Sequence, residues 1–136
     1  MLVPDVRDFV DGMGGFATRE ELLAAGCWPE RIDMAVYYGR ILRVRRGRYA
    51  SVDMPAAVLG ALRLGGKLAC VSALAHYEGT AQSEPIHVLV KHGSSRHGQQ
   101  PAVVHWTRRE LEGTRTLVSE EVARWQAASC RAARTT

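Results

Sequence analysis

Apolar side chains near the start of the chain recur at the spacing of a short amphipathic helix. At the i, i+3, i+4 and i+7 positions stand Val6, Phe9, Val10 and Met13. This pattern predicts a helix that begins at residue 4 or 5 and buries one face. Two adjacent glycines, at positions 14 and 15, end the pattern.

A second helix is predicted from Thr18, where the sequence has a capping box. The Thr18 hydroxyl and the Glu21 carboxylate, three residues apart, can each accept a hydrogen bond from a free amide at the helix start. Leu22 and Leu23 would form the buried face of this short helix. Gly26 suits the left-handed residue that ends a helix.

A third helix is predicted from Pro29 to Gly39. Pro29 suits a first helical position, and its inward positions are Ile32, Ala35 and Val36. The outward positions are Arg31, Met34 and Tyr38. Three short helices with a tight turn before the last are typical of a helix-turn-helix, whose last helix lies in the major groove of DNA. The alternative is a plain three-helix packing unit.

A basic β-hairpin is predicted directly after these helices. Residues 41–45 alternate in polarity, and residues 48–50 can return as the partner strand around a turn at Arg46 and Gly47. Arg45 and Arg48 would then face each other, which is unfavourable between like charges and would be relieved by a polyanion. We interpret this hairpin as a wing that contacts phosphates. The alternative is a solvated basic hairpin.

The rest of the chain predicts further helices and strands. We expect helices over residues 54–64 and 73–77, the second capped by Ser72, and β-strands over 86–91 and 102–106 that form a hairpin or small sheet. Ser119 can cap a last helix, whose apolar stripe would comprise Val118, Val122, Trp125 and Ala128 or Ser129. The fold class is therefore α+β, with a winged helix-turn-helix at 1–53 and a small α+β region at 54–136.

Composition limits the protein class. The chain has 136 residues, of which 46% are hydrophobic and 24% charged, enough apolar material for a core. No apolar run reaches the roughly 18 residues that a membrane span needs, and acids occupy the start, where a signal peptide is basic. We therefore expect a cytoplasmic protein with no membrane partner. Its three cysteines form no CxxC pattern and are interpreted as reduced thiols.

The net charge of +4 is unevenly distributed. Residues 1–36 contain seven acids and three arginines, whereas residues 37–50 contain five arginines and no acid. A local positive field of this kind is typical of a surface that binds nucleic acid.

The segment from Gly14 to Ala50 resembles the N-terminal winged helix-turn-helix of the AbiEi-like type IV antitoxin family. The motif residues are Gly14, Gly15, Thr18, Arg19, Glu21 and Leu22, followed by Gly39, Leu42, Arg43, Val44, Arg45, Arg46, Gly47, Tyr49 and Ala50. Looser similarity extends the match to roughly residues 12–107. The resemblance implies DNA binding, repression of the protein's own operon and antagonism of a nucleotidyltransferase-like toxin. A compact repressor encoded by a phage or another mobile element fits the chain length equally well, and the resemblance to this family also implies a role in phage immunity.

Motifs for catalysis are missing from the sequence. Metal-dependent nucleases need clustered carboxylates and usually a lysine close by, but neither Lys67 nor Lys91 follows an acid at that spacing. His87 and His105 could meet across neighbouring strands, yet no cysteine or carboxylate stands near either at ligand spacing. We therefore expect no metal, no cofactor and no enzymatic activity.

The leading hypothesis is a sequence-specific transcriptional regulator, a repressor, that binds double-stranded operator DNA. Arg31 and Tyr38 are candidates for contacts with base edges. The guanidinium fork of Arg31 matches the O6 and N7 acceptors of guanine. The remaining candidate residues would bind the phosphate backbone of the DNA. The full set of candidate DNA-binding residues is Arg19, Arg31, Tyr37, Tyr38, Arg40, Arg43, Arg45, Arg46 and Arg48. The alternative is an antitoxin or adaptor that binds a toxin protein. Both a homodimer on inverted half-sites and a monomer fit the sequence.

Overall fold

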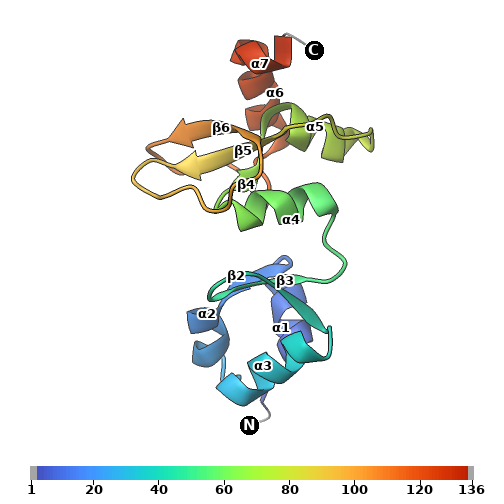
Figure 1. Ribbon diagram of the computed structural model, residues 1–136, viewed down its shortest axis with the longest axis vertical. Coiled ribbons are helices and arrows are strands. Elements are labelled where there is room, and N and C mark those ends of the chain that lie inside the picture. The colour runs from blue at the N-terminus through green and yellow to red at the C-terminus, as the bar shows by residue number, and fades with distance from the viewer. Residues whose placement is uncertain (1–2, 135–136) are drawn as a thin grey trace. The chain divides into compact units, whose positions relative to one another are not determined.

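The chain is a mixed α+β protein that divides into two compact units. A computed structural model describes residues 3–134 (Figure 1). The first unit ends at Pro55 and the second begins at Ala56. Among the described residues, no helix combines the length and the apolar character required to cross a membrane.

The first unit combines three short helices with a three-stranded antiparallel sheet of order β1-β3-β2. In chain order its elements are α1 (Val6–Gly12), β1 (Phe16–Thr18), α2 (Arg19–Ala24), α3 (Pro29–Tyr37), β2 (Ile41–Arg45) and β3 (Arg48–Ser51). Strand β1 was not predicted. It is only three residues long, and its partner β3 lies about thirty residues further along the chain, so no local pattern marks it.

Local signals in the sequence fix the helix ends of this unit. The Thr18 hydroxyl accepts a hydrogen bond from the Glu21 amide at 3.1 Å, and the Glu21 carboxylate accepts one from the Thr18 amide at 2.9 Å. The predicted capping box is therefore confirmed. Pro29 is the first residue of α3, as predicted.

A single hydrophobic core holds the three helices against the sheet. Its fully buried members come from every part of the unit and include Val10, Ala17, Leu22, Ile32 and Ile41. Helices α1 and α3 therefore bury the faces that their apolar spacing predicts. The prediction for α2 is only half right: Leu22 is fully buried, but Leu23 is 42% exposed, because it borders a surface groove and not the core. The opposite face of α3 stays exposed.

The β2–β3 hairpin turns at Arg46 and Gly47, and Gly47 has a positive φ of 70° that an L side chain rarely adopts. The register pairs Arg45 with Arg48, which confirms the predicted like-charged pair. The Arg19 amide donates to the Gly47 carbonyl at 2.9 Å. This bond holds the hairpin turn against the start of α2.

The second unit contains a three-stranded mixed sheet of order β4-β5-β6, together with helices. Strands β4 and β5 are antiparallel, whereas β5 and β6 are parallel; the two strands predicted from the sequence therefore form a sheet and not a hairpin. Its elements are α4 (Ala56–Arg63), β4 (Lys67–Leu68), α5 (Cys70–Glu78), β5 (Ile86–Lys91), β6 (Ala102–Thr107), α6 (Glu120–Ser129) and α7 (Arg131–Arg134).

Two details predicted for this unit are wrong. Ser72 is not a helix cap, because α5 already begins at Cys70, and the Ser72 hydroxyl instead accepts a hydrogen bond from the His87 amide at 2.8 Å. Ser119 does cap α6, as predicted. That helix, however, buries Ala123 and Gln126 and leaves Trp125 64% exposed, so the predicted stripe is not its buried face.

Candidate nucleic-acid interface

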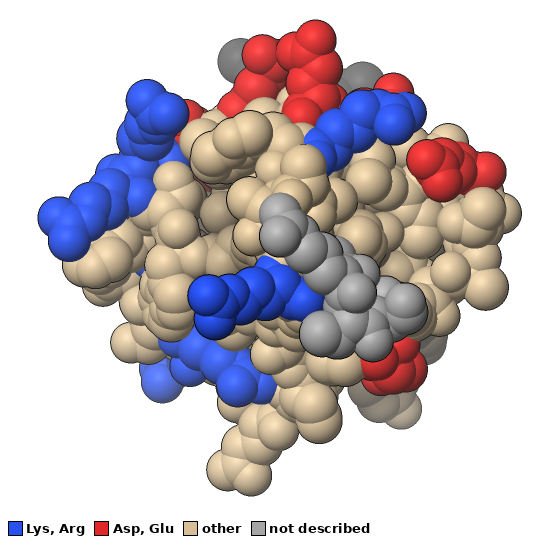
Figure 2. All heavy atoms as spheres, turned by 90° about the horizontal axis from the view of Figure 1, so that it is seen from above, with Lys and Arg blue, Asp and Glu red and all other residues tan. Residues whose placement is uncertain are grey.

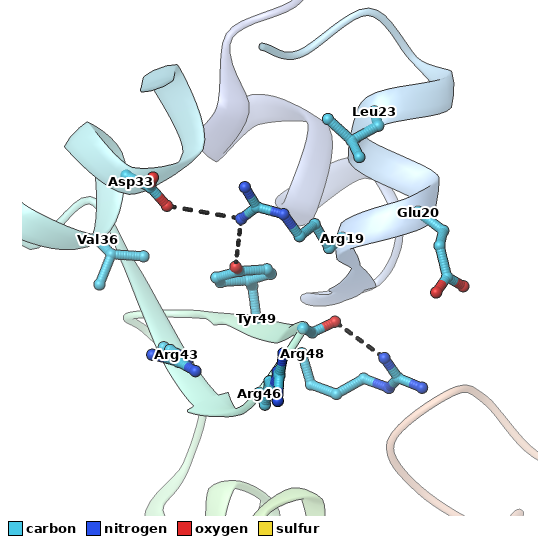
Figure 3. Close-up of a pocket in the computed structure, with 10 residues that line it drawn as sticks. Arg19, Glu20, Leu23, Asp33, Val36, Arg43, Arg46, Arg48 and Tyr49 are labelled. Carbon is cyan, nitrogen blue, oxygen red and sulfur yellow. Dashed lines mark hydrogen bonds and ion pairs between the residues drawn. The ribbon is translucent and has the colours of Figure 1, made fainter. Parts of the chain in front are cut away.

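A groove in the first unit is lined by α2, α3 and the β2–β3 hairpin (Figure 3). Four arginines border this groove, which we call the arginine groove: Arg19, Arg43, Arg46 and Arg48. Two carboxylates, those of Glu20 and Asp33, border it as well. The groove therefore has an excess of positive charge, although the first unit carries acids elsewhere.

Arg19 is held in place by two partners on different elements. Its Nη1 atom donates to the Tyr49 hydroxyl at 3.1 Å and lies 3.5 Å from an Asp33 carboxylate oxygen, and Figure 3 shows its guanidinium between these two groups. The hydrogen bond that Arg19 donates to Tyr49 is the main reason that the pKa of Arg19 is raised. Arg19 thus forms a fixed part of the groove wall that connects α2, α3 and β3.

The arginines of the hairpin differ in exposure. Arg43 and Arg46 are exposed, whereas Arg45 and Arg48 are half-buried. Burial lowers the pKa of Arg45, and the nearby charge of Arg48 lowers it further. Arg48 also donates to the Gly47 carbonyl at 3.0 Å. Arg43 and Arg46 are therefore the hairpin arginines most available to a ligand.

Three further candidate residues lie on the other flank of α3. Arg31, Tyr38 and Arg40 line a separate depression together with Asp5, whose carboxylate lies 3.6 Å from the Arg40 guanidinium. The structure therefore separates most of the candidate residues into two groups. Tyr37 and Arg45 line neither depression.

Exposed aromatic side chains stand at both ends of α3: Trp28 precedes its first residue, and Tyr37 and Tyr38 lie at its C-terminal end. Tyr37 is 82% and Tyr38 67% exposed, and their rings meet edge to face with centroids 5.0 Å apart. The Arg31 guanidinium lies 5.8 Å from the centre of the Trp28 ring. Sequence reasoning placed Arg31 and Tyr38 on the outward face of α3, and both are exposed.

Sequence reasoning missed the supporting groups of the groove. Asp33 and Tyr49 orient Arg19. Tyr49 was named only among the residues of the family resemblance, and Asp33 was not singled out, because each acts through a residue on another element. The helical spacing of Asp33, one residue after the buried Ile32, is the only signal that could have placed it on a flank of α3.

The face of the molecule drawn in Figure 2 differs from this groove, because basic and acidic side chains are both present on it. A mixed surface of this kind is typical of a solvated face.

Comparison with models of protein families gave no match, and comparison with curated proteins gave no relative. The assignment to the AbiEi-like family therefore stays a prediction.

Proposed function

We propose that the chain is a sequence-specific regulator, a repressor without enzymatic activity, that binds double-stranded operator DNA through a winged helix-turn-helix in its first unit. The order of elements supports this proposal. Helices α2 and α3 are joined by a short turn, and the β2–β3 hairpin follows immediately. In such modules the second helix of the pair enters the major groove, and a β-ribbon can grip the backbone beside it.

The distribution of arginines around α3 fits the shape of a major groove. That groove is bordered on both sides by phosphates and is about 12 Å wide. Arg43 and Arg46 stand on the hairpin side of α3, and Arg31 and Arg40 stand on its other flank. A helix that lies in the major groove would therefore carry arginines toward both phosphate backbones.

The observation that carries the proposal is the arginine groove beside an exposed helix face. The like-charged pair Arg45 and Arg48 is maintained by the hairpin register, and a bound polyanion would offset its repulsion. Within α3, Arg31 is suited to a guanine edge and Tyr38 to a neighbouring base.

Selection of bound duplexes from a random pool, followed by fluorescence anisotropy on the selected site, tests the proposal. Arg31→Ala should weaken binding to the selected site by about 1–3 kcal/mol and change binding to unrelated duplexes little. Met34→Ala, on the same exposed face, is the control for the loss of side-chain area. A pool in which no duplex is enriched would contradict the proposal.

A second candidate function is favoured by the exposed aromatic side chains at the two ends of α3. Trp28, Tyr37 and Tyr38 are each at least 60% exposed, and exposed aromatic side chains are enriched where proteins bind proteins. In this alternative the chain is an antitoxin or adaptor that binds a toxin protein, or a homodimer that uses these side chains. Co-purification of a stoichiometric partner, without binding to any duplex, would favour this candidate.

A further inference from the structure

Four side chains with metal-binding atoms converge inside the second unit. They are Cys70, His87, His105 and Cys130. They come from the first residue of α5, from β5, from β6 and from the residue that ends α6. Their four ligand atoms all lie within 4.8 Å of one another.

The separations between these atoms resemble the edges of a tetrahedral zinc site. With Zn–N bonds of about 2.05 Å and Zn–S bonds of about 2.3 Å, a tetrahedron has N···N edges of about 3.3 Å and N···S edges of about 3.6 Å. His87 Nδ1 and His105 Nε2 are 3.2 Å apart. The Cys130 sulfur lies 3.8 Å from each of these nitrogens. Only small movements are needed to reach bonding distances.

The backbone around the two buried ligands is held on several sides. The His87 amide donates to Ser72, and the His87 carbonyl accepts from the Ala69 amide at 2.9 Å. The Cys70 amide donates to the buried Gln126 side chain at 3.0 Å. Cys70 also has a φ of 53°, which is uncommon for a residue other than glycine and often marks a functional position.

The chemistry of these side chains fits metal ligands. Imidazole nitrogens and thiolate sulfurs are the atoms by which proteins commonly hold zinc. A divalent cation would displace the thiol protons, and two thiolates would balance its charge.

We propose that Cys70, His87, His105 and Cys130 bind one Zn²⁺ ion with His87 Nδ1, His105 Nε2 and both sulfurs as ligands. Two sulfurs and two imidazole nitrogens in tetrahedral array select zinc among common metals. Four protein ligands leave no open position, so the ion has a structural role. It connects the two parallel strands to α5 and to the end of α6. The site does not depend on the function proposed for the first unit.

Sequence reasoning expected no metal, because the four ligands are 17, 18 and 25 positions apart and form no recognisable motif. It did note that His87 and His105 could meet across neighbouring strands, and they do. The cysteines reach the two histidines only through the packing of α5 and α6, and no local sequence pattern predicts this packing.

Metal analysis of the full chain, purified under reducing conditions after growth with zinc, tests the proposal. We expect about one zinc per chain. Cys130→Ser and His105→Ala, which change the two half-buried ligands, should each lower the zinc content several-fold. Cys27→Ser, which removes a buried cysteine from the first unit, should leave it unchanged.

Cobalt(II) titration of the zinc-free wild-type chain provides a readout that needs no variant. The intense visible absorption of tetrahedral thiolate-bound cobalt should saturate at one ion per chain and disappear when zinc is added. A weak octahedral spectrum would overturn the proposal. Full zinc content in both ligand variants would overturn it too, as would a Cys70–Cys130 disulfide in freshly purified chain, detected as a mass lower by two hydrogen atoms.

Discussion

The two units differ in where their functional side chains lie, at the surface of the first unit and in the interior of the second. In the first unit the charged groups lie on the surface, around an exposed helix and a hairpin whose register keeps two arginines opposite each other. In the second unit the reactive groups are turned inward, and Cys70 and His87 are at most 4% exposed. The first arrangement suits the recognition of a charged partner, and the second suits the stabilisation of a small fold.

Metal removal should have the largest effect, and it should be confined to the second unit. Structural zinc contributes roughly 10–16 kcal/mol of apparent binding free energy in zinc-finger peptides at pH 7. Treatment with a strong chelator should therefore increase amide hydrogen exchange in α5, β5 and β6. The amides of α1 to α3 should keep their protection. Equal loss of protection in both units would contradict the expectation that the metal stabilises the second unit alone.

A core substitution in the first unit should produce the converse result. Ile32 is fully buried, and Ile32→Ala should lower the free energy of unfolding of this unit by about 2–5 kcal/mol, through lost burial and the remaining cavity. Urea unfolding followed by residue-resolved exchange measures the change. The exposed Met34 is the control on the same helix, and Met34→Ala should change stability by no more than about 0.5 kcal/mol. A changed zinc content in the Ile32→Ala variant would contradict the expectation that the two units are stabilised independently.

Loss of the two exposed hairpin arginines should weaken DNA binding without unfolding either unit. Each arginine that neutralises a phosphate contributes about −0.9 to the slope of log affinity against log salt. The Arg43→Ala, Arg46→Ala double variant should therefore make the slope shallower by about 2. A matched double variant, Arg7→Ala with Arg124→Ala, removes equal charge at residues that do not line the arginine groove and should leave the slope nearly unchanged. Equal effects from both pairs would show that only net charge matters.

Two hydroxyl caps, one in each unit, allow the smallest comparison. Thr18→Ala in the first unit and Ser119→Ala in the second each remove a hydroxyl that accepts a hydrogen bond from a helix amide at 3.1 Å. Each should lower the free energy of unfolding of its own unit by about 1 kcal/mol. Thermal unfolding of the two variants measures this. No change in either variant would mean that water replaces the caps at no cost.

Features encoded by neighbouring residues were predictable from the sequence. The capping box at Thr18 and Glu21, the start of α3 at Pro29 and the pairing of Arg45 with Arg48 each depend on residues a few positions apart. The physical causes of these features, end amides and turn geometry, act over the same short range.

Features created by long-range packing were not predictable. Strands β1 and β4 exist because distant strands pair with them. Helix α6 buries Gln126 because that side chain accepts from the Cys70 amide in another helix, and this contact overrides the apolar pattern around Trp125. The Cys/His cluster and the support of Arg19 by Asp33 and Tyr49 also arise from packing between residues that are distant in the sequence.

The salt dependence of duplex binding by the wild-type chain tests the central claim most directly. Anisotropy titrations of the selected duplex across a range of salt concentrations give the slope of log affinity against log salt. With four arginines of the arginine groove on phosphates, we expect a slope between about −3 and −4. A slope shallower than about −1, or no binding to any duplex, would contradict the proposal that this groove holds DNA.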